Sequence, residues 1–308
     1  MASATVDADG AGARLDQFVS RLVGGSVHAA RRLIADGRVS LDGRAARGAK
    51  KGLRLAAGQK VAVEVEANAS AGITPDGEAP LDVLYCDAHV IAVNKPAGIA
   101  SHPLRLGEKG TLANALVARF PECAGAGDDR REGGLGHRLD NGTSGVILAA
   151  RRHDVWLALR AALKAPTCEK SYLAEVVGHP AGPRGSLVEP IGRQGRRGSR
   201  VRVGGQGRNP LPAVTDWEVI EPRASSTLLR VRLHAGRAHQ VRAHLASLGH
   251  PLVGDGLYGH AAARDLARAL GAATVRLHAE SVRLQHPMSG EALSIEAPPP
   301  AWAKMAPP

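Results

Sequence analysis

A carboxylate stands at the start of an apolar run in the segment Gly136–Arg152, GHRLDNGTSGVILAARR. Asp140 is followed by Asn, Gly, Thr and Ser, which form tight turns because their side chains hydrogen-bond nearby backbone. A carboxylate on a short loop at a strand end can be aimed into a cleft with little loss of freedom, and the adjacent Arg138 favours its charged form. For an RLD triplet in isolation, an Asx turn with a surface ion pair is the commoner reading.

Other chemistries are disfavoured by spacing. GTSG lacks the arrangement of a G-x-S-x-G nucleophile elbow, and LDNGTSG lacks the later acidic ligands of a calcium loop. The chain contains no G-x-x-x-x-G-K-[ST] phosphate loop, and GRQGRRG does not open a helix after a strand. A nucleotide cofactor is therefore not predicted.

A second segment, Leu233–Gly259, reads LHAGRAHQVRAHLASLGHPLVGDGLYG and carries several polar side chains on a predicted helix. Its histidines suggest a metal site, but His239 and His244 diverge by roughly 140° around a helix. We therefore predict no metal. Arg242 lies between these two histidines.

The elements that must position these groups are mainly strands. From Leu81 onward the chain alternates apolar and polar residues in short runs, with helices predicted at 154–164, 240–248 and 261–270. No regular alternation of strand and helix is present, which predicts an α+β domain with a mixed, mainly antiparallel sheet over 81–300. A stretch rich in Ala, Gly and Pro, 67–80, predicts a linker before it.

Residues 13–66 predict a separate small α/β module: two helices, a hairpin turning at Asp42-Gly43, and a further strand. Basic residues gather on its second helix and beyond. They include Arg31, Arg32 and Arg38. The module resembles the ribosomal-protein S-four-like RNA-binding domain, and the resemblance implies an RNA-binding surface on the helix pair and hairpin. The alternative is a small cap with solvated charges.

The whole chain is strongly basic, with a net charge of +11 over 308 residues and a pI near 10.2. A basic surface concentrates polyanions, so nucleic acid is the first candidate partner and an anionic membrane the second. An arginine-rich stretch, 192–210, contains Arg196 and Arg197 among glycines and predicts a loop that is either solvated or in contact with phosphates.

The compartment is predicted from what the chain lacks. No apolar run approaches the roughly 20 residues of a membrane span, and the first residues carry two aspartates and no basic signal region. Three cysteines in no paired spacing favour the reducing cytoplasm over a disulfide framework.

Four strings in the second part of the chain together resemble the RluA-type pseudouridine synthase family. They are NKPAGIASHP, GHRLDNGTSGVILAAR, KSYLAEV and GRAHQVRAHLASLGHPLVGDGLYG, spanning roughly residues 81–296. The resemblance implies the pseudouridine synthase fold and isomerisation of a uridine already in RNA, without a cofactor. The glycosidic bond from N1 breaks, the uracil turns, and a carbon–carbon bond forms from C5.

The resemblance also implies catalytic residues. Asp140 corresponds to the family's catalytic aspartate, which either adds to the nucleoside or removes a sugar proton. Arg242 corresponds to the arginine that pairs with this carboxylate, and Tyr172 to the tyrosine that stacks on uracil and handles protons. Taken alone, Tyr172 reads as a strand core residue.

RNA contacts follow from the same motifs. Arg138 occupies the position that fills the space of the extruded base, because unstacking a base costs a few kcal/mol. Leu148 and Leu245 are predicted to line the uracil pocket. Lys95 and His102 are predicted to serve as scaffold or as phosphate contacts.

Two departures from the family pattern lie near the site. Ala238 stands where the family commonly has a threonine that could cap the following helix. Asn141-Gly142 replaces the usual longer polar or charged pair after the aspartate. Neither change removes a predicted catalytic group.

The predicted partner is ribosomal large-subunit RNA first and transfer RNA second, for a monomeric protein. A non-catalytic RNA-binding or ribosome-assembly protein on the same fold is the main alternative. A glycoside hydrolase is disfavoured, since it would usually need a second catalytic carboxylate and aromatic sugar platforms, and the chain has three Trp.

Overall fold

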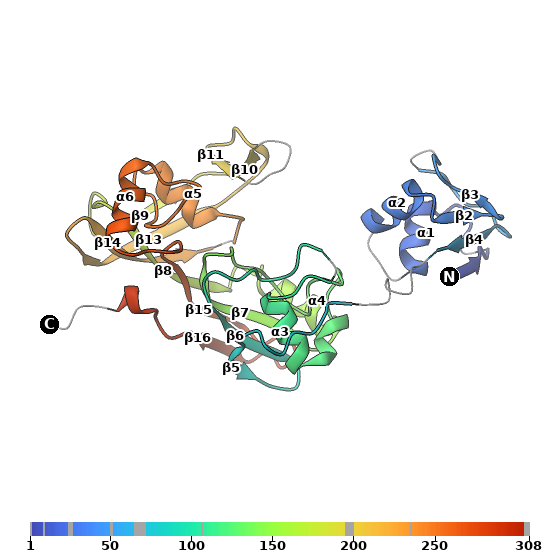
Figure 1. Ribbon diagram of the computed structural model, residues 1–308, viewed down its shortest axis with the longest axis horizontal. Helices are drawn as coiled ribbons and strands as arrows, with labels where there is room; N and C mark the ends of the chain where they lie inside the picture. The colour runs from blue at the N-terminus through green and yellow to red at the C-terminus, as the bar shows by residue number, and fades with distance from the viewer. Residues whose placement is uncertain are drawn as a thin grey trace.

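The protein folds into two units in a computed structural model (Figure 1). The structure describes residues 2–8, 10–23, 27–49, 52–64, 72–105, 107–194, 200–234 and 236–304, and only the backbone of 28, 29 and 32. The first unit is a small module of strands and two helices, and the second is built on a nine-stranded sheet. No helix in the described part of the chain is both long and apolar enough to cross a membrane.

The N-terminal module consists of β1 (Ala2–Thr5), α1 (Leu15–Leu22), α2 (Val27–Ala35), β2 (Val39–Leu41), β3 (Arg44–Ala45) and β4 (Lys60–Val63). Its antiparallel sheet has the order β1-β4-β2-β3. The predicted hairpin is present: Asp42 and Gly43 have φ of 51° and 80°, the paired positive values of a type I′ turn. Strand β1 precedes residue 13, so the module begins earlier than the helical pattern indicates.

The second unit contains the predicted mixed, mainly antiparallel sheet. Its strands are β5 (Asp82–Cys86), β6 (Val90–Lys95), β7 (Ser144–Ala150), β8 (Glu169–Val177), β9 (Arg184–Val188), β13 (Val214–Pro222), β14 (Ser226–Leu233), β15 (Leu277–Gln285) and β16 (Ala292–Glu296). The order is β5-β6-β7-β15-β8-β14-β13-β9, with β16 beside β15. Every pairing in this sheet is antiparallel except β7 with β15.

Among the described residues, four α-helices accompany this sheet: α3 (Leu112–Arg119), α4 (His153–Ala162), α5 (Gln240–Ser247) and α6 (Ala261–Ala269), with short 3-10 turns η2 (Pro121–Gly125) and η3 (Ala301–Ala303). The ends of α4, α5 and α6 match those of the predicted helices within two residues. Helix α3 was not predicted, although Thr111 and Asn114 cap it reciprocally through side chain and backbone.

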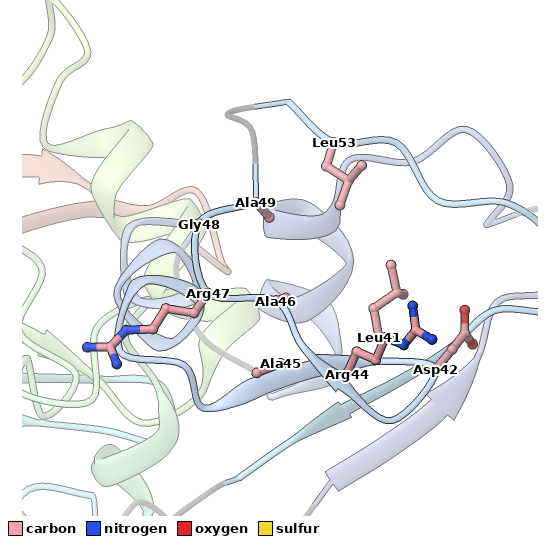
Figure 2. A pocket seen from close by; sticks show the side chains of 9 residues that line it. All are labelled: Leu41, Asp42, Arg44, Ala45, Ala46, Arg47, Gly48, Ala49 and Leu53. Carbon is pink, nitrogen blue, oxygen red and sulfur yellow. The ribbon is translucent and has the colours of Figure 1, made fainter.

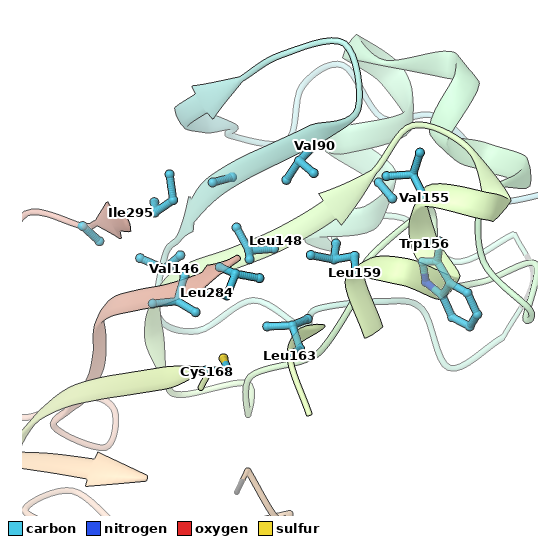
Figure 3. Packing of buried hydrophobic residues seen from close by; sticks show 14 residues of the cluster. Val90, Val146, Leu148, Val155, Trp156, Leu159, Leu163, Cys168, Leu284 and Ile295 are labelled. Carbon is cyan, nitrogen blue, oxygen red and sulfur yellow. The ribbon is translucent and has the colours of Figure 1, made fainter. Parts of the chain in front are cut away.

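Strand β7 separates two hydrophobic clusters, because successive side chains of a strand point to opposite faces. Leu148 packs with Trp156 and Leu159 of α4 on one face (Figure 3). Ile147 and Ala149 belong to the other cluster, which includes α3 and contacts Tyr172. Ile73, inside the predicted linker, is buried in that second cluster, so the larger unit begins before residue 81.

The arginine-rich stretch is more ordered than the predicted loop. It forms β10 (Ile191–Gln194), β11 (Arg200–Val203) and β12 (Arg208–Leu211), a three-stranded antiparallel sheet in the order β11-β10-β12. Ile191 and Val201 bury against Ala243 of α5, which anchors this small sheet to the domain. Arg196 and Arg197 lie outside the described residues.

Candidate active site

Asp140 lies on the loop that enters β7, and the NKPAGIASHP segment holds the backbone on both sides of it. Before the carboxylate, the buried Ser101 hydroxyl donates to the Leu139 carbonyl at 2.8 Å and accepts from the Leu139 amide at 3.1 Å. After it, the Asn141 carbonyl accepts from the Gly98 amide at 2.9 Å. This loop therefore has little freedom to move.

Lys95 adds a third restraint on the same loop. Its side chain is fully buried, and Nζ donates to the carbonyls of Pro96, Ile99 and Asn141 at 2.9, 2.8 and 3.1 Å. Burial lowers the pKa of Lys95 to about 8, although the charge of Asp140 opposes the shift. Because its three donors are used internally, Lys95 acts as scaffold and is not available to phosphates.

Arg242 joins Asp140 to a second carboxylate. Its Nη1 donates to Oδ2 of Asp140 at 2.6 Å, while Nε and Nη2 donate to the two oxygens of Asp255 at 2.8 Å each. Burial opposes the charge of Arg242, but the bonds and charges of Asp255 and Asp140 outweigh it and raise its pKa above the usual range. The planar guanidinium is thus oriented by one carboxylate to present an edge to the other.

Asp255 is the residue of this site that the sequence reasoning missed. Its side chain is 0% exposed, and Oδ1 also accepts from the amides of Leu257 and Tyr258 at 2.9 and 3.0 Å. Burial raises the pKa of Asp255, but Arg242 and these amides lower it below the usual value. Gly254 precedes it at φ 79°, and a Cβ there would meet the Thr274 carbonyl oxygen at 2.3 Å. The sequence Gly254-Asp255-Gly256 was the available indication that this carboxylate lies in a tight turn.

His239 faces the other oxygen of the carboxylate. It begins α5 in the left-handed conformation, with φ 55° and no capping bond from its side chain. Its Nε2 lies 3.6 Å from Oδ1 of Asp140, beyond a normal hydrogen bond. Ala238 has no side chain that could cap the helix. The side chain of Gln240 instead accepts a hydrogen bond from the Arg237 amide at 3.0 Å.

Tyr172 lies in the middle of β8, opposite Val231 of β14 and Ala279 of β15. Its ring packs between two of the hydrophobic clusters. Burial first, and then the nearby charge of Asp140, raise the pKa of Tyr172 above its usual range. The phenol is therefore neutral at physiological pH and lies within electrostatic reach of the carboxylate.

Arg138 does not pair with Asp140 as the sequence suggested. It is exposed, and within the described part of the chain no ion pair or hydrogen bond holds it. His102 lies near it: burial, and then the charges of Arg138 and Arg131, lower the pKa of His102. Arg131 is paired with Asp129, whereas Arg138 also lowers the pKa of His239, the imidazole that faces Asp140.

The two leucines predicted for the uracil pocket lie in different places. Leu245 is buried on α5 in the cluster that contacts Tyr172. Leu148 is fully buried against α4 instead, on the opposite face of β7 from Tyr172's cluster. The placement of Leu148 in the pocket was wrong, because the strand alternation directs its side chain away.

The arginines of the N-terminal module are distributed over its surface. Arg31 is exposed and donates to Asp16 at 2.8 Å, whereas Arg38 is half-buried. For Arg32 the structure describes only the backbone. Arg44 and Arg47 line an open pocket behind the β2–β3 hairpin (Figure 2). This pocket belongs to the module and not to the surroundings of Asp140.

A metal centre is not indicated by the described residues, which contain no group of three or more potential ligands placed to hold an ion. What the arrangement can do chemically is hold one carboxylate with a guanidinium on one oxygen, an imidazole near the other, and a neutral phenol alongside. That is a site for a single acid–base or nucleophilic oxygen.

Comparison with known proteins decides the family. The sequence profile described as RNA pseudouridylate synthase matches residues 89–247, a span that contains Asp140, Tyr172 and Arg242. The chain belongs to the RNA pseudouridylate synthase family. Like other pseudouridine synthases it is an isomerase acting on RNA, as its resemblance to the RluA-type members implied. The S4 domain profile matches residues 13–52 and confirms the N-terminal module.

Relatives cover most of this synthase. A ribosomal large subunit pseudouridine synthase D of Xanthomonas campestris is 38% identical over 274 residues, 87% of this chain and 79% of that protein. An uncharacterized RNA pseudouridine synthase of Mycobacterium bovis is 37% identical over 293 residues, 94% of this chain and 92% of its own. The solved human RNA pseudouridylate synthase domain containing 1 is 28% identical, with a TM-score of 0.58 over 73% of this chain and 86% of that one.

Proposed function

We propose that this synthase isomerises a uridine of ribosomal large-subunit RNA, with Asp140 as the catalytic carboxylate. The observation that carries the roles is the arrangement of Asp140, Arg242 and Tyr172, which come from a loop, a helix and a strand far apart in sequence. The RNA class is supported by the name of the Xanthomonas campestris relative.

The reaction needs one oxygen at the sugar. The carboxylate of Asp140 either adds to the nucleoside or removes a sugar proton, and the bond from N1 to the sugar breaks. The uracil turns, C5 forms the new bond to the same sugar carbon, the proton on C5 leaves to solvent, and N1 is protonated. In the addition route the bond to Asp140 then breaks, and in the other route Asp140 returns the proton to the sugar, so the carboxylate is regenerated. Atoms balance without a co-reactant.

Each neighbour has a role in that sequence. Arg242 holds one carboxylate oxygen, so the other is directed to the sugar. Tyr172 stacks on the uracil, and its neutral hydroxyl relays the C5 proton to solvent. Arg138, exposed and unpaired within the described residues, fills the space that the extruded base leaves in the RNA stack.

Binding draws on two further basic surfaces. The N-terminal module presents Arg44 and Arg47 at its pocket, and the small β10–β12 sheet presents exposed arginines without an acidic residue in its sequence. Contacts of both surfaces with phosphates would strengthen binding and make it salt-dependent. We place the synthase in the cytoplasm as a monomer; its three unpaired cysteines agree with a reducing compartment.

A position-resolved map of pseudouridine in RNA from cells with and without the protein tests this function. We expect one or a few positions of large-subunit RNA to lose the modification, and Asp140→Asn to fail to restore them while still binding RNA. A loss confined to transfer RNA would move the substrate there. Unchanged maps, or an active Asp140→Asn protein, would refute the proposal.

A further inference from the structure

The arginine-bearing β10–β12 sheet connects to the catalytic carboxylate through two polar side chains. The Val201 amide of β11 donates to the Tyr258 hydroxyl at 2.9 Å, and that hydroxyl lies 3.0 Å from Nδ1 of His239. Nε2 of the same imidazole faces Oδ1 of Asp140 at 3.6 Å. A continuous line of polar groups therefore runs from β11 to the carboxylate.

The direction of the protons along this line follows from the partners. Because the Tyr258 oxygen already accepts from Val201, its own proton is free to go to Nδ1 of His239. Burial lowers the pKa of His239; Arg242 and Arg138 also lower it, while Asp140 and Asp255 oppose the shift. A neutral imidazole that accepts a hydrogen bond at Nδ1 carries its proton on Nε2, which faces the carboxylate. In the other tautomer, the lone pair on Nε2 would repel the carboxylate.

The gap between His239 and Asp140 is small. A normal N–H···O bond is about 2.9 Å, so a movement of about 0.7 Å closes the observed 3.6 Å separation. The other oxygen of Asp140 is already held by Arg242 at 2.6 Å. Of these two partners, His239 is therefore the one whose distance to the carboxylate can still shorten.

The outer side of β11 is suited to RNA. Arg200 and Arg202 flank Val201 and, by strand alternation, point away from its buried side chain; both are exposed. Val201 itself packs on Ala243 of α5, next in sequence to Arg242. Figure 1 shows β10 and β11 beside α5. A phosphate drawn to the outer face therefore acts on a strand that touches the helix of the active site.

We propose that Tyr258 and His239 are positioning residues that couple occupancy of β11 by RNA to the orientation of Asp140. The proposal rests on Asp140 being the catalytic carboxylate. RNA bound to Arg200 and Arg202 packs β11 more closely against α5. The Tyr258 hydroxyl then keeps His239 in the tautomer that carries its proton on Nε2. That proton forms a hydrogen bond with Oδ1 of Asp140. The carboxylate is then held at both oxygens when substrate is present, and the second lone pair of Oδ1 stays available to the sugar.

The test is a single-turnover assay of pseudouridine formation over a range of RNA concentrations, which separates the limiting rate from the half-saturating concentration. Tyr258→Phe keeps the ring that lies under Arg242, 5.4 Å from its guanidinium carbon, and removes the hydroxyl. We expect its limiting rate to fall about tenfold, the loss of roughly one hydrogen bond, with the half-saturating concentration unchanged.

Coupling is measured by combining variants. Arg200→Ala with Arg202→Ala should raise the half-saturating concentration and lower the limiting rate in the natural protein. In the Tyr258→Phe background the concentration effect should persist and the further loss of limiting rate should disappear, because the connection is already broken. Limiting-rate losses that simply multiply would overturn the proposal.

His239 variants identify the atom. His239→Asn suits the left-handed backbone and keeps an acceptor near Nδ1, but it lacks the Nε2 donor, so its limiting rate should match that of Tyr258→Phe. His239→Gln places an amide nitrogen near Nε2 and should recover part of the rate. Equal rates for these two variants would contradict the role of the donor. An inactive Asp140→Asn beside fully active Tyr258 and His239 variants would refute this coupling alone and leave the proposed function intact.

Discussion

Asp255→Asn tests whether the buried carboxylate aims Arg242 at Asp140. The substitution keeps the shape of the side chain and one acceptor oxygen. If that oxygen takes the place of Oδ1, it retains the Leu257 and Tyr258 amides and Nη2 of Arg242. The new amide group then faces Nε of Arg242, where donor meets donor in place of a 2.8 Å bond.

The magnitude follows from that single loss. A hydrogen bond between charged groups contributes about 1.5–3 kcal/mol, and an unpaired buried donor adds to the cost, so we expect the free energy of unfolding to fall by about 3 kcal/mol. Arg242 then presents Nη1 to Asp140 less well. If about half of the loss is felt in the transition state, the limiting rate falls roughly tenfold, since 1.4 kcal/mol corresponds to a factor of ten.

The assay is release of the C5 hydrogen from RNA labelled at that position, in single turnover, beside unfolding in denaturant. Glu175→Gln is the matched control, because Glu175 is equally buried and pairs with Arg276 and Arg223 away from Asp140. It should lose similar stability at an unchanged rate. Equal rate losses in both variants would show that the effect is general destabilisation, and a natural rate in Asp255→Asn would refute the aiming role.

Three further predictions concern charge. Lys95 titrates near pH 8 when folded and near 10.5 when unfolded, so the unfolded chain binds more protons between these values. The free energy of unfolding should therefore rise with pH through that window, by up to about 3 kcal/mol relative to Lys95→Met; parallel curves would contradict this. Arg138→Ala should leave stability within about 0.5 kcal/mol, as exposed residues do, yet slow modification, and less so when the target uridine is already unpaired. Arg44→Ala with Arg47→Ala should weaken RNA binding and reduce the slope of log affinity against log salt by about 1–2; an unchanged slope would exclude both from phosphate contact.

The sequence predicts the elements better than the contacts between them. Helices α4, α5 and α6 follow from apolar spacing, and the I′ turn at Asp42-Gly43 from local chemistry alone. Asp140 and Arg242 are 102 residues apart, so their contact is predicted by the family resemblance and not by any local pattern.

What escaped prediction depends on tertiary packing. Asp255 looks like a turn residue between glycines until Arg242 is placed beside it. The face of Leu148 depends on the register of β7, which one sequence does not reveal. The arginine-rich stretch forms a sheet because Ile191 and Val201 pack against α5, which lies about 40 residues or more away along the chain.

The parallel pair β7–β15 joins the loop that carries Asp140 to a strand near the end of the chain. Ser144 meets His278 there, so the loop carrying Asp140 is anchored to a strand made 134 residues later. Such distant pairing closes slowly, because chain entropy must be lost before any contact is gained. We therefore expect a nascent chain that ends before β15 to be inactive even when α3 and α4 have formed, because the strand that anchors the loop of Asp140 is still missing.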